Sequence, residues 1–393
     1  MPDDPLATLR VLAADPYADW ADRYPGRRAI GTFCTYAPAE VLHAAGFVPV
    51  RLVPAGAGLA GADKHLQTYT CAVARGVLTA VTAGRWDWLT GVVFPHTCDT
   101  MQALADVWRE ARCKRRTGAR CKRRTGARPG DYVGVLVGPV AVESPAAETY
   151  QVAELRRFIA HLEAHFGVTI DDGTLRASIR AYNERRRLLM ALRDVLPYSD
   201  WLRGALAGLS MPVEEHSRLL TAFTQVSPLP LPPPNWGGPR GGEDGPGVRV
   251  LLVGAVLDDP ALPAFIEELG GRVVDDDLCT GRRSFETLVD EELADPVVAL
   301  ARRELRRPPC PARYAPSQSR STRLLRLVRE SQAEGVILLQ TKFCEPHAFD
   351  LPPLRAALAE HAAGVPHLTL DVEGSAVDGA LQTRVQAFLE MLT

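Results

Sequence analysis

The chain has 393 residues, which suggests two or three domains of about 100–200 residues each. Its composition, with 46% hydrophobic and 23% charged residues, is typical of a globular protein with a substantial core. The formal net charge of −2 provides no basic excess for nucleic acid, and no apolar run approaches the roughly 20 residues that span a bilayer. The acidic start lacks an apolar signal region, so we expect a cytoplasmic protein that binds neither nucleic acid nor membrane.

The first α/β unit is predicted over residues 1–145, where strand-like and helix-like segments alternate. Pro38 is well placed as the first residue of a helix that ends at Ala45. The apolar run of residues 91–94 predicts a buried strand, and a polar turn follows it. The other elements of this unit are predicted over residues 10–30, 47–53, 69–78, 100–110 and 132–137. Three aromatic side chains of the first segment are expected on the surface: Tyr17, Trp20 and Tyr24.

An eight-residue segment, residues 112–119, is repeated without change as residues 120–127. Such a direct repeat resembles a slippage duplication or a sequence error more than a folded repeat. Its many basic residues suggest nucleic-acid binding, but nothing nearby supplies stacking aromatics or a second basic patch. We therefore interpret the duplication as a solvated loop in which Cys113 and Cys121 have no chemical role.

Residues 146–227 are predicted to form a helical block. Apolar residues recur at helical spacing over residues 150–166 and 175–195, with charged outer faces. Three consecutive arginines, residues 185–187, are interpreted as part of such a solvated face. The proline and glycine density of residues 228–247 cannot form a regular element and marks a domain boundary.

The second α/β unit is predicted over residues 248–393. Its strands are expected over residues 248–254, 272–274, 335–340 and 367–370, and its helices over residues 261–269, 322–334, 352–363 and 377–392. Three aspartates, residues 275–277, suggest either a divalent-cation site or, as the preferred interpretation, an acidic loop at a strand end. Repeated alternation of strand and helix predicts a parallel sheet covered on both faces.

The cysteines carry the main chemical signal. In a chain expected to be cytoplasmic, the eight cysteines are interpreted as reduced thiols or metal ligands rather than disulfides. Cys71, Cys98 and Cys344 all fall at strand ends or helix starts. Ligands bind at the carboxyl ends of parallel strands, and helix N-termini favour thiolate. Placement alone leaves three explanations open, namely buried thiols, a zinc site or a shared iron–sulfur cluster.

The sequence resembles the benzoyl-CoA reductase/2-hydroxyacyl-CoA dehydratase subunits in five segments that follow one another along nearly the whole chain. These segments are residues 31–50, 95–102, 276–282, 342–346 and 383–390. The duplicated basic insert departs from the family, where only a short loop is expected. The resemblance implies two flavodoxin-like or Rossmann-like parallel-sheet domains, with the helical block between them.

The resemblance also implies a [4Fe–4S] cluster between the domains, held by Cys71, Cys98 and Cys344. Three ligands in place of the usual four cysteines leave one iron open to water or substrate. The implied substrate is an acyl-CoA. In a 2-hydroxyacyl thioester the proton to be lost, on the β carbon, is not acidic, so acid–base catalysis alone does not reach it. One low-potential electron forms a ketyl that expels the hydroxide, and reduction of an aromatic acyl thioester has the same requirement.

In this family the electron comes from a separate ATP-hydrolysing iron–sulfur activator, in keeping with a sequence that has no Gly-x-x-x-x-Gly-Lys-Ser/Thr phosphate loop. The other expected partner is a second homologous subunit, either identical or different. Two alternatives remain: a non-catalytic scaffold subunit, and a double-cubane cluster reductase of small molecules that would use more of the cysteines.

Three side chains are candidates for catalysis. Glu40 is a candidate acid–base residue, although a carboxylate is also favoured in the first turn of a helix. Thr35 would bind the substrate oxygen or only cap a turn, and His96 would donate a proton or contact cluster sulfur, unless it is a satisfied loop histidine. The cysteines outside the implied ligand set are expected to serve packing or to surround the cluster: Cys34, Cys279 and Cys310.

Overall fold

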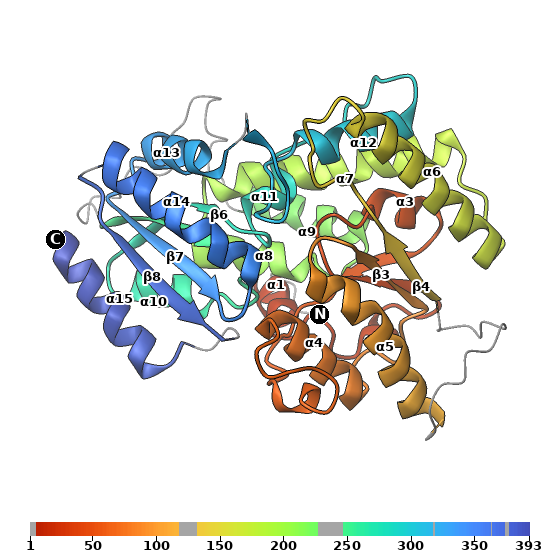
Figure 1. Cartoon of the computed structure of the whole chain (residues 1–393), viewed down its shortest axis with the longest axis horizontal. Coiled ribbons are helices and arrows are strands. Elements are labelled where there is room, and N and C mark those ends of the chain that lie inside the picture. Colours follow the sequence, from red (N-terminus) through yellow and green to blue (C-terminus); the bar gives the residue numbers. More distant parts are fainter. Residues whose placement is uncertain (1–4, 118–131, 227–246, 317–318, 363, 374–376) are drawn as a thin grey trace.

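The structure is a computed structural model of the chain. It describes residues 5–117, 132–226, 247–316, 319–362, 364–373 and 377–393. The second copy of the duplicated segment and nearly all of the expected linker lie outside the described residues. Two α/β units lie at opposite ends of the molecule, with helices between them (Figure 1). No helix in the described part of the chain combines the length and apolar character needed to cross a membrane.

The first unit is built on a parallel sheet with the strand order β2-β1-β3-β4. Its strands are β1 (Ala29–Thr32), β2 (Val48–Arg51), β3 (Gly91–Pro95) and β4 (Tyr132–Leu136). Its connecting helices are α3 (Ala39–Ala44), α4 (Ala72–Ala83) and α5 (Asp99–Thr117), with a short 3-10 turn η1 (Ala60–Ala62). Val92 and Phe94 of β3 pack in one core cluster with residues of α4 and α5, whereas Val93 packs in another with residues of α3. This alternation follows the two-residue period of a strand and buries both faces of the sheet.

The second unit repeats this topology with the strand order β6-β5-β7-β8, again all parallel. Its strands are β5 (Arg249–Gly254), β6 (Arg272–Asp277), β7 (Gly335–Thr341) and β8 (His367–Val372). Its helices are α10 (Ala261–Glu268), α13 (Arg320–Ser331), α14 (Glu345–His361) and α15 (Gly379–Leu392). The α/β class expected from the sequence is confirmed in both units.

Helices join the two units into one core. They are α1 (Pro5–Ala14), α2 (Trp20–Arg23), α6 (Ala147–Phe166), α7 (Asp172–Arg193), α8 (Tyr198–Ala207), α9 (Val213–Val226), α11 (Arg282–Phe285) and α12 (Pro296–Arg306). Trp201 of α8 is buried and contacts Phe285 of α11, with ring centroids 5.3 Å apart. One hydrophobic cluster therefore extends from Leu9 of α1 through α8 to Phe388 of α15.

Several local expectations were wrong. Tyr17, Trp20 and Tyr24 are buried rather than on the surface, and the Trp20 ring stacks on Trp88 with centroids 4.3 Å apart. The first copy of the duplicated segment is not entirely a loop, because α5 continues to Thr117. Cys113 within it is disulfide-bonded rather than a reduced thiol. Helix α14 begins at Glu345, seven residues before the expected start at Pro352, and contains three prolines, one in its first turn and two in its interior. Helices α11 and α12 were not expected at all.

The three aspartates of residues 275–277 are also not a solvated loop. They lie within β6 and are buried. Asp277 contacts Arg320 at 3.0 Å and Arg323 at 2.9 Å, with Arg283 at 3.7 Å. Burial alone would raise the pKa of Asp277, but these guanidinium groups hold it well below its usual range. Arginine side chains, rather than a divalent cation, thus balance the charge of Asp277.

We predict that Asp277→Asn lowers the free energy of unfolding by about 3–5 kcal/mol, because buried guanidinium groups lose their counter-charge. Urea denaturation at neutral pH measures the change. Asp106→Asn is the matched control, since Asp106 is 82% exposed in a surface ion pair with Arg109 and should change stability by about 0.5 kcal/mol or less. Equal effects of the two substitutions would contradict the structural role assigned to Asp277.

Candidate functional site

Three cysteines lie where helices begin, as the sequence pattern predicted. Cys71 is the residue before the first turn of α4, and Cys344 holds the same position before α14. Cys98 directly precedes Asp99, the first residue of α5, and follows β3. Exposed backbone N–H groups at these positions favour a thiolate over a thiol.

The structure brings these three thiols together, although they come from both α/β units. Cys71 and Cys344 form a side-chain hydrogen bond, and Cys98 interacts electrostatically with both. The loops are also joined through their backbones, because the Ala72 amide donates to the carbonyl of Lys342 at 3.3 Å. Residues far apart in the chain therefore form a single thiol site between the units.

Hydrogen bonding sets the protonation of this pair. The bond from Cys344 lowers the pKa of the Cys71 thiol to about 7, against the effect of burial, and amide groups of Ala74 and Val73 lower it further. The same bond, together with burial, raises the pKa of Cys344. The bond therefore favours the thiolate form at Cys71 over that at Cys344.

The thiols of Cys71, Cys98 and Cys344 are of the chemical kind that binds an iron–sulfur cluster. Within the described residues, no three His, Cys, Asp or Glu side chains converge closely enough to hold one metal ion. An iron–sulfur cubane spans several atoms, so its cysteine ligands need only surround it. Three thiols on separate helix starts fit that requirement, and soft thiolate is the ligand that such clusters take.

The other three free cysteines form a neighbouring group. Cys279 accepts a hydrogen bond from Arg283 at 3.2 Å, and the Ala312 amide donates to Cys310 at 3.3 Å. Burial, followed by the nearby Cys279 and Cys34, raises the pKa of Cys310 to about 12. Cys34 interacts with both Cys310 and Cys98, so it connects this group to the first thiol site.

Two of the predicted catalytic residues, Glu40 and Thr35, are held by arginine side chains. Glu40 is 3% exposed and forms an ion pair with Arg186 of α7. Burial would raise the pKa of Glu40, but Arg186 and Arg303 lower it to about 2. The hydroxyl of Thr35 accepts a hydrogen bond from the buried Arg307. These contacts favour a structural role for the Glu40 carboxylate and a fixed position for the Thr35 hydroxyl. The acid–base role of Glu40 and the substrate-binding role of Thr35 stay predictions.

His96 lies elsewhere. Its backbone amide donates to the Leu136 carbonyl at 2.7 Å, and its Nε2 lies 2.7 Å from the Gln102 side-chain oxygen. It is therefore a hydrogen-bonded loop residue close to Cys98, which is compatible with either interpretation made from the sequence.

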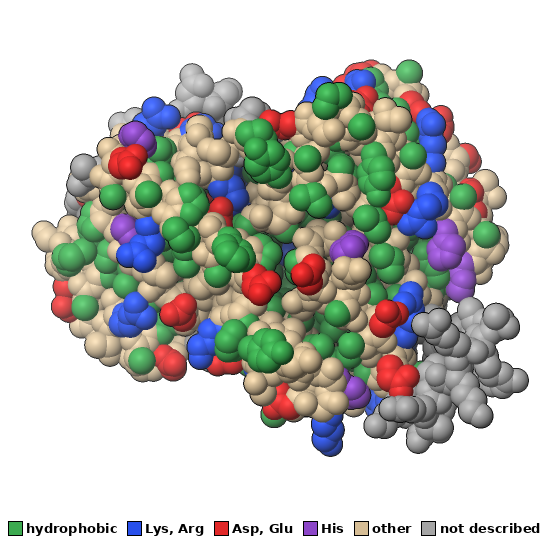
Figure 2. All heavy atoms as spheres, viewed as in Figure 1, with side chains coloured by type: hydrophobic (Ala, Val, Ile, Leu, Met, Phe, Trp, Pro, Cys, Tyr) green, Lys and Arg blue, Asp and Glu red, His purple; other side chains and the backbone are tan. Residues whose placement is uncertain are grey.

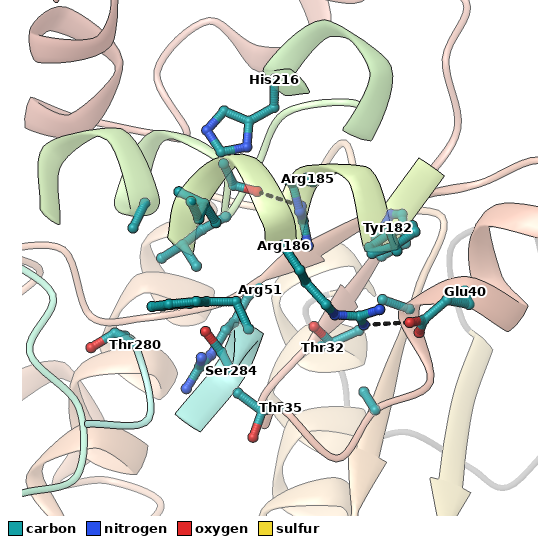
Figure 3. Close-up of a pocket in the computed structure, with 18 of the residues that line it drawn as sticks. Thr32, Thr35, Glu40, Arg51, Tyr182, Arg185, Arg186, His216, Thr280 and Ser284 are labelled. Carbon is teal, nitrogen blue, oxygen red and sulfur yellow. Dashed lines mark hydrogen bonds and ion pairs between the residues drawn. The ribbon is translucent and has the colours of Figure 1, made fainter. Parts of the chain in front are cut away.

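Glu40 and Thr35 border a cavity of about 110 Å³ that also touches Cys34 (Figure 3). Sequence analysis missed most of its charged lining. The three consecutive arginines were interpreted as a solvated face, which is correct for the exposed Arg187 but wrong for Arg186, which is 5% exposed. Tyr182, Arg186 and Leu189 recur at helical spacing along one buried face of α7, and that spacing was the available signal.

Comparison with known proteins decides the family. Residues 34–392 match the family model described as 2-hydroxyglutaryl-CoA dehydratase, D-component. The chain belongs to this family. The match covers the second α/β unit, the first unit from Cys34 onwards and the six free cysteines of the described residues.

Curated relatives agree with this family. The chain is 28% identical to a benzoyl-CoA reductase subunit from Thauera aromatica, over 89% of this chain and 86% of that protein. It is 26% identical to the beta subunit of lactoyl-CoA dehydratase from Anaerotignum propionicum, over 98% of each chain. It is 25% identical to the beta subunit of (R)-2-hydroxyglutaryl-CoA dehydratase from Acidaminococcus fermentans, over 93% of each. These relatives are all dehydratase or reductase subunits, and they confirm the enzyme class expected from the sequence.

We predict that Glu40→Gln lowers the free energy of unfolding at pH 7 by about 3–5 kcal/mol, because Arg186 stays buried without its partner. The pKa of Glu40 is lowered from 4.5 to about 2, so its contribution is complete above pH 4.5 and is lost as the pH falls towards 2. The difference between the wild type and the variant should therefore shrink below pH 4.5 in urea denaturation. Glu184→Gln, on the exposed face of α7, is the control and should change little. Unchanged stability with lost turnover would instead support the acid–base role.

Proposed function

We propose that this chain is a catalytic iron–sulfur subunit of a 2-hydroxyacyl-CoA dehydratase or benzoyl-CoA reductase-type enzyme. The observation that carries the proposal is the meeting of Cys71, Cys98 and Cys344 between the two α/β units. A protein that served only as a scaffold would have no need to bring three thiols from separate helix starts to one place. Membership of the dehydratase family supplies the substrate class, an acyl-CoA thioester.

The three cysteines would hold a [4Fe–4S] cluster with one iron free of protein ligands. When bound, such a cluster supplies single electrons at low potential, as reduction of a thioester to a ketyl requires. The protein's own contribution is to hold the three sulfurs at helix starts and to limit their contact with bulk water by placing them at least partly buried between the units.

Partners are part of the proposal. The relatives' names identify each of them as one subunit of a larger enzyme. Tyr69 and Phe343, which lie within two residues of Cys71 and Cys344, are 67% and 49% exposed. Hydrophobic and acidic side chains also border the hollow at the centre of the face in Figure 2. Exposed aromatics beside an electron-accepting site suit a second homologous subunit and an ATP-dependent iron–sulfur activator.

We predict that Cys71→Ser, Cys98→Ser and Cys344→Ser each abolish the iron–sulfur absorbance of anaerobically purified protein, because each removes one ligand. Cys113→Ser, which lies in the duplicated segment on α5, should keep the iron content of the wild type at about four irons per chain. Iron and sulfide analysis with electron paramagnetic resonance provides the measurement. Iron loss from Cys113→Ser equal to that of the other three would overturn the ligand assignment.

We also predict that the purified chain alone does not turn over any 2-hydroxyacyl-CoA or aromatic acyl-CoA. Turnover should require a second family subunit, the activator with ATP, a strong reductant and the exclusion of oxygen, which attacks an exposed iron. Omitting one component at a time, with chromatographic detection of acyl-CoA products, tests each requirement. Steady turnover in air without ATP or a partner would disprove the proposed mechanism.

One observation favours a second candidate function, a double-cubane cluster reductase of small molecules. Cys310 interacts with both Cys279 and Cys34, and Cys34 also interacts with Cys98. Six thiols could then hold twice the iron of a single cubane, roughly eight atoms per chain. Iron content near eight that falls by half in Cys310→Ser would favour this candidate, whereas a chain with no iron would indicate a scaffold subunit.

A further inference from the structure

The cavity of about 110 Å³ lies where three parts of the molecule meet. Thr32 and Arg51 come from the first sheet. Arg185 comes from α7 and His216 from α9. The second unit contributes Thr280, together with Ser284 and Phe285 of α11. Figure 3 shows these side chains around one space, with the Arg186–Glu40 ion pair on one wall.

The cavity lining carries an excess of positive charge. Four arginines border it, namely Arg51, Arg185, Arg186 and Arg303, whereas Glu40 is the one carboxylate among its lining residues. Glu40 is already bound to Arg186, and Arg303 contacts Glu304 at 2.7 Å. Arg51 and Arg185 therefore remain as cations for which no carboxylate partner is found in the described chain.

These two arginines also keep unused donors. Arg51 is 9% exposed, and its Nη1 donates to the Cys279 carbonyl at 2.7 Å while its buried Nε has no partner among the described residues. Arg185 packs over the Tyr182 ring at 4.6 Å and makes one long bond, 3.4 Å, to the Gly208 carbonyl. The Nε of Arg185 likewise lacks a partner within the described residues.

Buried cations are normally paired, because an unpaired charge in a protein interior is strongly unfavourable. The arginines lie close enough to affect one another. Burial, and then the positive charge of Arg186, lower the pKa of Arg303 to about 10. His216 does not add charge, since burial and Arg185 lower its pKa to about 3. The hydroxyls of Thr32, Thr280 and Ser284 complete a polar lining.

We propose that this cavity binds a small oxyanion, either a short organic carboxylate or a phosphate group, with Arg51 and Arg185 as its cationic walls. A cavity needs a volume of about 10–15 Å³ to hold one water molecule. The volume of about 110 Å³ therefore leaves room for several water molecules or for one small anion. Guanidinium groups bind carboxylate and phosphate through charge-assisted hydrogen bonds. The inference does not depend on the proposed cluster, because none of its cationic residues is a proposed ligand.

Isothermal titration calorimetry on the full-length chain tests the proposal. Acetate, glutarate and phosphate are titrated separately at constant ionic strength, which is balanced with chloride so that general screening stays fixed. We expect saturable binding to the wild type. Arg51→Gln and Arg185→Gln should each bind about tenfold more weakly or worse, because each loses a charge-assisted bond.

Arg180→Gln is the matched control, because Arg180 lies on the exposed face of the same helix α7 and its loss changes the net charge equally. It should bind the anion as the wild type does. A second readout is the melting temperature. Without anion, Arg185→Gln should not lower it, since this substitution removes an unpaired charge. The anion should raise the melting temperature of the wild type and of Arg180→Gln more than that of Arg51→Gln or Arg185→Gln.

Preference for acetate or glutarate would identify an organic acid as the ligand, and preference for phosphate would identify a phosphate group. Absence of saturable binding for all three anions, or equal affinity of the wild type and the two cavity variants, would overturn the proposal. Because iron content is measured on the same samples, loss of anion binding and loss of the cluster are distinguished.

Discussion

Two ion pairs made by one helix, each with a buried carboxylate, link the two α/β units. Arg186 of α7 pairs with Glu40 in the first unit, and Arg193 of the same helix pairs with Asp275 of β6 in the second, at 2.9 Å. The two arginines are seven residues apart, two helical turns, so they lie on nearly the same face of α7. Each pair is largely desolvated, and breaking either one leaves a buried charge. The separation between the two sheets, and with it the meeting of the thiols, depends on this helix.

The thiol site follows from this arrangement and from strand direction. In a parallel sheet all carboxyl ends lie on one edge, and both sheets here have equivalent strand orders. Cys98 after β3 and Cys344 after β7 therefore occupy equivalent positions in the two units. With α7 setting the distance between the units, the two edges face each other, and Cys71 completes the group from the first turn of α4.

Most strands and helices could be predicted from the sequence because their signal is local. Apolar runs bounded by turns located the strands, and cysteines that followed those runs were placed correctly at helix starts. Errors arose where burial depends on partners distant in the chain. The local sequence predicts Asp277 to be a loop residue, because its partners Arg320 and Arg323 come from a distant helix. It predicts Arg186 to be solvated, because its partner Glu40 lies far away in the chain. The cationic cavity was missed for the same reason, since its walls come from three separate parts of the chain.

The four strands of each sheet come from one continuous part of the sequence, which affects the order in which the protein folds during synthesis. All strands of the first sheet are complete by Leu136, and those of the second begin at Arg249, so neither sheet waits for a strand from the other. Domains fold in order as the chain leaves the ribosome. Cys71 and Cys98 belong to the unit that is synthesised first, but Cys344 follows only after the last central strand, β7. The thiol site therefore does not exist in the nascent chain until synthesis is nearly finished, and any cluster must be inserted into the completed protein.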